Sequence, residues 1–302
     1  MAEPSNDLPP QGGAERPPSG LTRISERVRQ IVAPNPSPFT FTGTCVYVVG
    51  AGEVAVIDPG PADPAHLDAL LAAIPDERVA RIVVTHSHRD HAAGAALLKQ
   101  RTGAPIVGAP AHIVADGKPT RSDASHAADY APDEALADGA RVAGRGFTLE
   151  AIATPGHAAN HLSFALIEEN ALFSGDHVMA WSTSVIAPPD GSMRAYLASL
   201  EKVARRSESI YWPGHGGPVR EPQRYVRGLI VHRRQREAAI LARLAAGEAS
   251  VAEIVAQVYP GLAPALTGAA SLSTLAHLED LTERGLASSD RGIALEARFR
   301  RV

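Results

Sequence analysis

The sequence predicts an α/β protein in which layers of sheet are covered by helices, followed by a smaller module. Two observations carry this prediction. From residue 21 to about residue 221, short apolar runs typical of strands alternate with turns and amphipathic stretches. From about Glu221 onward the pattern changes to helical stretches that end in two short apolar runs around a turn. Strands mixed with helices indicate sheets packed against helices, and the second pattern suggests a winged-helix module.

The first part of the chain contains eight predicted strands and three predicted helices. The apolar runs predict strands at 45–49, 54–57, 81–84, 105–107, 147–152, 162–167, 171–173 and 209–211. Turn residues at 50–53 and 168–170 favour hairpins between the strands that flank them. Helical spacing predicts helices at 64–74, 92–101 and 193–207.

The last part of the chain predicts three helices and a hairpin. A long helical stretch covers 225–246, and Ser250-Val-Ala-Glu253 is a capping box that opens a second helix. A third helix is predicted at 271–285, followed by a hairpin within "LASSDRGIALEARF". We therefore expect three parts: a disordered tail at 1–22, a catalytic domain at 23–222 and a winged-helix-like domain at 223–302.

Composition limits the class of protein. A chain of 302 residues that is 45% hydrophobic can bury a large core. The net charge of -4 gives no general reason to expect a polyanionic partner, although residues 223–302 carry 11 Arg against 8 Asp and Glu. The lone Cys45 excludes internal disulfides and suits a reducing compartment. We find no signal peptide and no apolar run long enough to span a membrane, so we expect a cytoplasmic location.

The stretch "VTHSHRDHAAG" at 84–94 is the first candidate functional motif. His86 and His88 are two residues apart, so they cannot be neighbours on a helix, where adjacent side chains are three or four apart. They can converge from a loop at the end of the strand 81–84, together with Asp90 and His91. Imidazoles combined with a carboxylate favour zinc, with iron or manganese as alternatives.

Three other strands end in the same way. Each apolar run stops at a tight turn that delivers one metal-binding side chain: His157 in Thr-Pro-Gly-His, Asp176 in Ser-Gly-Asp and His215 in Pro-Gly-His. Loops that follow strands gather at one edge of a layered sheet, where sites are built. Four strand ends with suitable donors therefore predict a metal site at that edge.

In this order, the motifs resemble those of the metallo-β-lactamase superfamily, over roughly residues 25–220. The resemblance implies a four-layer αββα sandwich with two metals at one edge. It implies that the first metal is held by His86, His88 and His157, the second by Asp90, His91 and His215, and that Asp176 bridges both. Asp58 in "VIDPG" matches an early acidic position of the superfamily that is usually structural.

This constellation predicts a binuclear metal-dependent hydrolase. Two divalent cations, zinc first, would lower the pKa of a shared water, so that a metal-bridging hydroxide attacks an ester, a thioester or a related small-molecule bond. The absence of a Gly-x-Ser-x-Gly motif agrees with water as the attacking group. Asp90 and Asp176 are the predicted catalytic residues, and Asp90 would also orient the hydroxide. A dedicated β-lactamase is disfavoured, because such enzymes commonly replace the bridging carboxylate with Cys or Ser.

Three alternatives stay open. The C-terminal module resembles that of a subgroup of β-lactamase-like hydrolases, some of which cut single-stranded RNA, so a metal-dependent endoribonuclease or phosphodiesterase is the main one. The arginines that could contact phosphates are Arg224, Arg227, Arg233, Arg234 and Arg236. The others are a nucleic-acid-binding winged-helix protein and a mononuclear iron sulfur oxygenase. The oligomeric state is left open, and no membrane partner is expected.

The remaining histidines receive simpler interpretations. We expect His161 to lie behind the ligands rather than among them, and His177 either to line the pocket or to be an ordinary buried residue. Those predicted to lie at the surface are His66, His112, His126, His232 and His277. The segment 181–192 should form a stiff loop over the site, and 116–139 a polar excursion or lid.

Overall fold

The computed structural model describes residues 20–111 and 126–302, so most of the predicted tail, His112 and the start of the predicted lid lie outside the described residues. The end of the predicted tail belongs to the fold. Leu21 packs against the core, and Thr22 pairs with Gln30 of the next strand. The tail prediction was therefore too long, because these residues have partners that the sequence pattern did not reveal.

Two sheets form the centre of the molecule. The first contains, in spatial order, β1 (Thr22–Arg23), β2 (Val28–Val32), β3 (Cys45–Ala51), β4 (Glu53–Ile57), β5 (Arg78–Val84), β6 (Ile106–Gly108) and β7 (Glu134–Ala135). The second contains β12 (Ile210–Pro213), β11 (Ala171–Gly175), β10 (Leu162–Leu166), β9 (Phe147–Ala153) and β8 (Arg141–Gly144). Both predicted hairpins, β3–β4 and β10–β11, are present, and a short 3-10 helix at Ile167–Glu169 joins the second pair.

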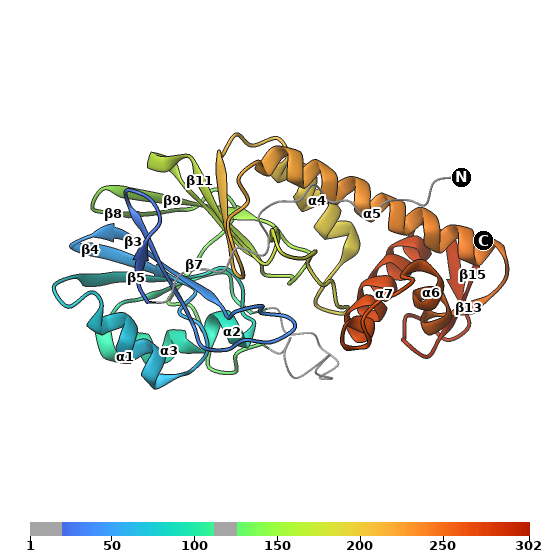
Figure 1. Ribbon diagram of the computed structural model, residues 1–302, viewed down its shortest axis with the longest axis horizontal. Helices are drawn as coiled ribbons and strands as arrows, with labels where there is room; N and C mark the ends of the chain where they lie inside the picture. The colour runs from blue at the N-terminus through green and yellow to red at the C-terminus, as the bar shows by residue number, and fades with distance from the viewer. Residues whose placement is uncertain (1–19, 112–125) are drawn as a thin grey trace.

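Helices cover the outer face of each sheet. The first sheet is covered by α1 (Pro64–Ala72) and α3 (Gly94–Thr102), and the second by α4 (Met193–Val203) and the start of α5 (Pro222–Ala245). Figure 1 shows the two helical layers on opposite sides of the sheets. One apolar cluster, which includes Val49 and Phe164, fills the space between the sheets. The predicted four-layer αββα sandwich is confirmed.

The C-terminal module is a winged helix, as predicted. Its elements are β13 (Ala249–Ser250), α6 (Val251–Val258), a 3-10 helix (Pro264–Leu266), α7 (Thr267–Glu283), β14 (Ala287–Ser289) and β15 (Arg298–Arg301). Ser250 and Glu253 form the expected capping box at the start of α6. The module has its own apolar core, in which Ile254, Leu278 and Phe299 are fully buried.

The long helix α5 joins both parts (Figure 1). Tyr225 and Leu229, near its beginning, pack into the cluster that covers the second sheet. Ile240 and Leu244, near its end, pack into the core of the winged helix. The division at residues 222 and 223 falls in the first turn of this helix and stays a prediction. In the described part of the chain, no helix has the length and apolar character needed to cross a membrane.

Candidate metal centre

Loops that follow β5, β9, β11 and β12 bring the seven predicted side chains to one edge of the sandwich. The short helix α2 (Arg89–Ala92) begins in the first of these loops. Three sets of donor atoms, each lying within 4.8 Å of one another, are formed by His86, His88 and His157, by His86, His91 and Asp176, and by Asp90, His91 and His215. The strand ends therefore bring together the residues proposed as ligands.

The imidazole nitrogens that face inward are close together. The distances are 3.0 Å from His86 Nε2 to His88 Nδ1, 3.1 Å from His157 Nε2 to His88 Nδ1, and 3.2 Å from His91 Nε2 to His215 Nε2. Donors around a tetrahedral metal with bonds of about 2.0–2.1 Å are separated by about 3.3–3.4 Å. The observed spacing is close to this value, so the cluster suits a metal ion.

Outward contacts fix the orientation of these rings. In three of them Nδ1 hydrogen-bonds an oxygen atom: His91 to Asp58 Oδ2 (2.9 Å), His157 to the Val185 carbonyl (2.7 Å) and His215 to the Gly43 carbonyl (3.2 Å). Because these oxygens only accept, each Nδ1 carries a proton, and Nε2 is the nitrogen that faces inward and can bind a metal. This is the tautomer that a metal ligand requires.

Asp58 orients a fourth ring as well. The Thr85 hydroxyl donates to Asp58 Oδ2 at 2.7 Å, and the same hydroxyl oxygen lies 3.0 Å from His86 Nδ1. The hydroxyl oxygen therefore accepts the Nδ1 proton of His86 and leaves Nε2 free to bind. Asp58 also accepts from the Thr85 N–H at 2.8 Å. These contacts agree with the structural role expected for Asp58.

His88 has a separate carboxylate partner that sequence reasoning missed. Its Nε2 lies 3.3 Å from Asp190 Oδ2, so Nδ1 is the nitrogen left for the cluster. Asp190 also accepts from the Ala159 N–H at 3.1 Å. Burial opposes its charge, but His88 and this N–H hold the pKa of Asp190 below its ordinary value. The available signal was that Asp190 is the single acidic residue of the loop 181–192.

The two central carboxyl groups remain ionised. Burial opposes their charge, yet His91 and His215 hold the pKa of both Asp90 and Asp176 well below the ordinary range. Burial lowers the pKa of His215, but Asp176 and Asp90 outweigh it and raise that pKa to about 9, so a metal that binds Nε2 would displace a proton from it. Asp176 Oδ1 is buried and has no hydrogen-bond partner among the described residues. A buried set of two carboxylates and inward-facing imidazole nitrogens fits divalent cations.

Asp176 lies between His157 and His215. Its Oδ2 lies 3.6 Å from His157 Nε2, in the set with His86 and His88, and 3.4 Å from His215 Nε2, in the set with Asp90 and His91. Gly214 passes directly behind it, and a Cβ at Gly214 would lie only 2.4 Å from Asp176 Oδ1 and 2.6 Å from His91 Cε1. The glycine of this Pro-Gly-His turn is thus required by close packing against the centre.

His161 and His177 lie behind the cluster. His161 Nε2 accepts from the Asp176 N–H at 3.1 Å, and its Nδ1 lies 2.9 Å from Thr154 Oγ1, so both nitrogens are occupied. The prediction that it lies behind the ligands is confirmed. His177 is fully buried and packs edge to face on Tyr196, with the ring centroids 5.0 Å apart. It is therefore an ordinary buried histidine.

The prediction of surface histidines was wrong for four residues. His66 and His277 are buried. His126 and His232 are half-buried, and His126 packs beside His88. His277 is buried because α7 lies between the rest of the winged helix and the sandwich. On the sandwich side, Arg194 of α4 forms an ion pair with Asp280 of α7 at 2.7 Å. The polar neighbours of these histidines in the sequence concealed such long-range contacts.

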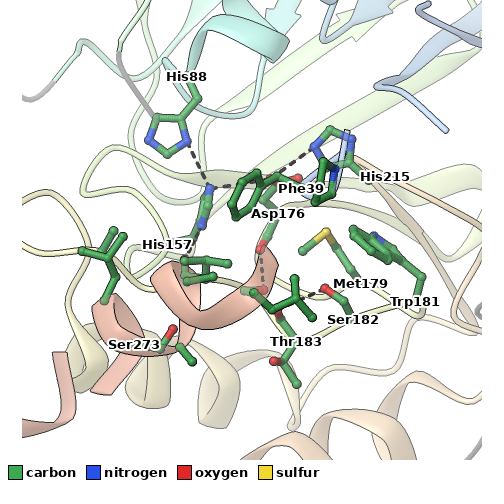
Figure 2. A pocket seen from close by; sticks show the side chains of 18 of the residues that line it. Phe39, His88, His157, Asp176, Met179, Trp181, Ser182, Thr183, His215 and Ser273 are labelled. Carbon is green, nitrogen blue, oxygen red and sulfur yellow. Dashed lines mark hydrogen bonds and ion pairs between the residues drawn. The ribbon is translucent and has the colours of Figure 1, made fainter. Parts of the chain in front are cut away.

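A cavity of about 370 Å³ extends from the centre toward the winged helix. Figure 2 shows His88, His157, Asp176 and His215 along one side of it and Ser273 of α7 away from them. Much of the lining is apolar and includes Phe39, Met179, Trp181, Leu262, Leu266 and Leu272. The loop 181–192 contributes several lining residues, and so does the C-terminal module, whose part in the cavity was not predicted.

Arg233 is also found in the wall of this cavity rather than on the surface. It is one of the arginines that could contact phosphates under the nuclease alternative, but it is 2% exposed. Its guanidinium donates to the Ser184 carbonyl and lies over the Tyr196 ring, 5.3 Å from the centroid. It faces inward because α5 packs on α4 at this point, and this prediction is corrected.

Comparison with known proteins agrees with this geometry. Residues 39–215 match the family model described as "Metallo-beta-lactamase superfamily". The chain belongs to this superfamily. Residues 250–294 match the "Beta-lactamase associated winged helix domain" that some of its members carry. Within the superfamily, the chain is a metal-dependent hydrolase.

Several relatives in the superfamily carry informative names. A Caenorhabditis elegans "Beta-lactamase-like protein 2 homolog" is 32% identical over 79% of this chain and 78% of its own length. "Thioesterase pkgB" of Emericella nidulans is 32% identical over 74% of this chain, which spans only 60% of that protein. An "Atrochrysone carboxyl ACP thioesterase" of Aspergillus fumigatus is 29% identical over 78% of this chain and 74% of its own length.

Solved structures share the fold across nearly the whole chain. A metallo-beta-lactamase family protein from Thermus thermophilus superposes with a TM-score of 0.76 at 23% identity, covering 93% of this chain and 100% of that one. A beta-lactamase domain protein from Burkholderia ambifaria gives 0.77 at 20% identity, covering 93% of each. At these identities the likeness concerns the fold alone.

Proposed function

We propose that this protein is a binuclear metal-dependent hydrolase that cleaves a thioester or ester of an apolar small molecule. The observation that carries the proposal is that Asp176 lies between His157 and His215, which belong to two different sets of donors, at the end of an apolar cavity. Two relatives are named thioesterases, and the name of one of them specifies an acyl carrier protein (ACP) thioesterase. These names favour the thioester among the candidate bonds.

The proposed ligands are those of the cluster. His86, His88 and His157 would hold one metal, Asp90, His91 and His215 the other, and Asp176 would bridge them. Zinc suits this nitrogen and oxygen set, with iron or manganese as alternatives. When bound, two divalent cations supply an acidified water and polarise the carbonyl of the substrate.

The side chains of the protein prepare the reaction. Asp90 borders the cavity and is ionised, so its carboxylate can accept a hydrogen bond from the attacking water and orient it. Asp58, Asp190 and the carbonyls of Gly43 and Val185 keep the five imidazoles in the ligand tautomer. The apolar wall holds the acyl part and keeps bulk water away from the reacting bond.

The burial of α7 favours a small molecule over a nucleic acid. In a winged helix, the second helix of the helical pair is the one that enters a DNA groove. Here that helix is α7, and Ala269, Leu272, Ser273, Ala276 and Asp280 on it are buried. The Ser273 hydroxyl accepts from the Ile186 N–H of the catalytic part at 3.3 Å. A helix held in this way borders the cavity and is not presented to a duplex.

The test combines metal analysis with a parallel assay. We expect about two metal ions per chain and hydrolysis of a thioester or ester when a thioester, a lactone, a β-lactam, a bis-phosphodiester and an RNA oligonucleotide are offered. Asp90→Asn should lower kcat by at least about 100-fold, whereas Asp68→Asn, at an exposed site on α1, should not. Full turnover of Asp90→Asn with full metal content counts against the role of Asp90, and cleavage of RNA alone would reassign the enzyme as a nuclease.

Location is part of the same proposal. The single cysteine, Cys45, is buried and unpaired, which suits a reducing compartment. We therefore keep a cytoplasmic location as an expectation, and cell fractionation with an antibody against the protein tests it.

A further inference from the structure

Arg233 is a buried cation without a counterion among the residues at 20–111 and 126–302. It lies in the middle of α5 and borders the cavity. A guanidinium has five N–H donors. Among the described residues, the Ser184 carbonyl is its hydrogen-bond acceptor, and its buried Nε has none. Burying a charge is unfavourable unless a partner compensates it, so this arrangement requires an explanation.

Within the described part of the chain, no carboxylate forms an ion pair with Arg233. On one side lies the Tyr196 ring, which attracts a cation only weakly. Two histidines lie nearby, and their pKa values are lowered by burial first and then by the charge of Arg233, to about 4 for His232 and about 3 for His277. Both are neutral at physiological pH. The guanidinium is therefore positioned to receive an anion from the cavity.

Arg233 and the metal centre are linked through one residue. The Ser184 carbonyl accepts from Arg233, and the Ser184 hydroxyl donates to the Asp176 carbonyl at 2.6 Å. Asp176 and Arg233 border the same cavity. The carboxylates that line it, Asp90, Asp176 and Asp190, all contact imidazoles of the centre. Arg233 thus provides a separate positive position in the wall of the same cavity.

We propose that Arg233 binds a carboxylate of the substrate while the thioester or ester carbonyl lies at the metal centre. This inference rests on the proposed function and specifies its substrate as an acyl compound with an apolar body and one anionic group that reaches Arg233 within the same cavity. A carboxylate matches the single charge of the guanidinium and its planar donors. A phosphate dianion would leave a second charge in an apolar wall, where it is poorly compensated.

Binding of two inert probes to the metal-loaded enzyme tests the proposal. In both probes a methylene replaces the thioester sulfur, giving a ketone that cannot be hydrolysed, and the acyl chain ends in a carboxylate or in its methyl ester. By titration calorimetry, the carboxylate probe should bind at least about tenfold more tightly, as expected for a charge-assisted contact. A third probe that ends in a phosphate separates the two kinds of oxyanion.

Two substitutions assign the preference to Arg233. Arg233→Gln and Arg233→Met should abolish it while the methyl ester probe binds with unchanged affinity. The matched control is Arg234→Gln, which removes the next charge of the same helix, an exposed residue paired with Glu201 at 3.0 Å. It should retain the preference. Arg233→Met also removes an unpaired buried charge, so its free energy of unfolding should not fall below that of the wild type.

Each result bears on the proposal independently of protein stability. Equal binding of the two probes by the wild type overturns it, even when neither variant folds. A folded Arg233→Gln protein that keeps the preference also overturns it, and tighter binding of the phosphate probe overturns the choice of a carboxylate. A carboxylate preference without any thioester or ester hydrolysis would support the anion site and reject the proposed reaction. Hydrolysis without the preference would support the reaction and reject the anion site.

Discussion

Replacing Asp58 with asparagine tests how the metal centre is held together. The Asp58 carboxylate accepts from the Thr85 N–H through Oδ1, and from the Thr85 hydroxyl and His91 Nδ1 through Oδ2. Asparagine has the same shape but only one accepting oxygen. It also tolerates the left-handed backbone found here, since Asp58 has a φ of 49°. The substitution therefore changes hydrogen bonding with little steric change.

Either orientation of the new amide brings two donors face to face. With its nitrogen at the Oδ1 position, the Thr85 N–H loses its acceptor, at a cost of about 1–3 kcal/mol in the free energy of unfolding. With its nitrogen at the Oδ2 position, His91 must move its proton to Nε2, the nitrogen that faces the centre. We therefore expect a loss of affinity of about 10–100-fold for the metal held by Asp90, His91 and His215, the usual effect of removing a residue that orients a ligand.

Metal titration against a chromophoric chelator measures the affinity, and urea unfolding of the metal-free protein measures the stability. Asp68→Asn is the control, because Asp68 is a surface residue whose side chain is 70% exposed and pairs with Arg101. An Asp58→Asn protein with wild-type metal affinity and wild-type stability would refute the reasoning, because it would show that neither the charge nor the second acceptor of Asp58 orients His91.

Three further outcomes follow from the structure. Burial lowers the pKa of His277 from 6.5 to about 3, so the unfolded chain binds the extra proton and stability is lost as the pH falls below 6.5. Urea unfolding of the wild type should then lose up to about 1.4 kcal/mol more per pH unit between about pH 6 and pH 4 than His277→Asn does, and equal slopes would exclude this titration. Gly214→Ala should lower kcat/KM at least about 100-fold with an unchanged circular dichroism spectrum, because the new Cβ would lie 2.4 Å from Asp176 Oδ1. Full activity of this variant would contradict the packing described. Chelation should abolish hydrolysis and lower Tm, because metals that bind only the folded state stabilise it, and added zinc should restore both; an unchanged Tm would exclude a bound metal.

The sequence predicted the catalytic part of the fold in considerable detail. Apolar runs of strand length ended at tight turns, and every predicted strand of the sandwich is present within a few residues. The side chains from His86 to His215 could be assigned to one site because the loops after the strands meet at one edge. Their role as ligands stays a proposal, but their convergence is a direct result of where the apolar runs stop.

Contacts between distant segments could not be predicted in this way. The sequence around His277 shows that α7 has an apolar face, but not that α4 covers the opposite side of the same helix. Arg233 was interpreted as a surface charge for the same reason. Asp190 was missed because a carboxylate in an irregular loop carries no periodic signal, and only the folded loop brings it to His88. Periodicity identifies a buried face without identifying the segment that buries it.

Because α5 belongs to two apolar cores, it joins a part of the chain that carries the reaction to a part that helps to select the substrate. The proposed metal ligands lie between His86 and His215, whereas the C-terminal wall of the cavity comes from residues such as Tyr259 and Ser273. Substitutions from Tyr259 into α7 can therefore reshape substrate choice without touching a donor atom. In evolution, such a division lets one reactive centre be inherited while selectivity diverges, and in the laboratory it marks the winged helix as the segment to exchange when a new substrate is wanted.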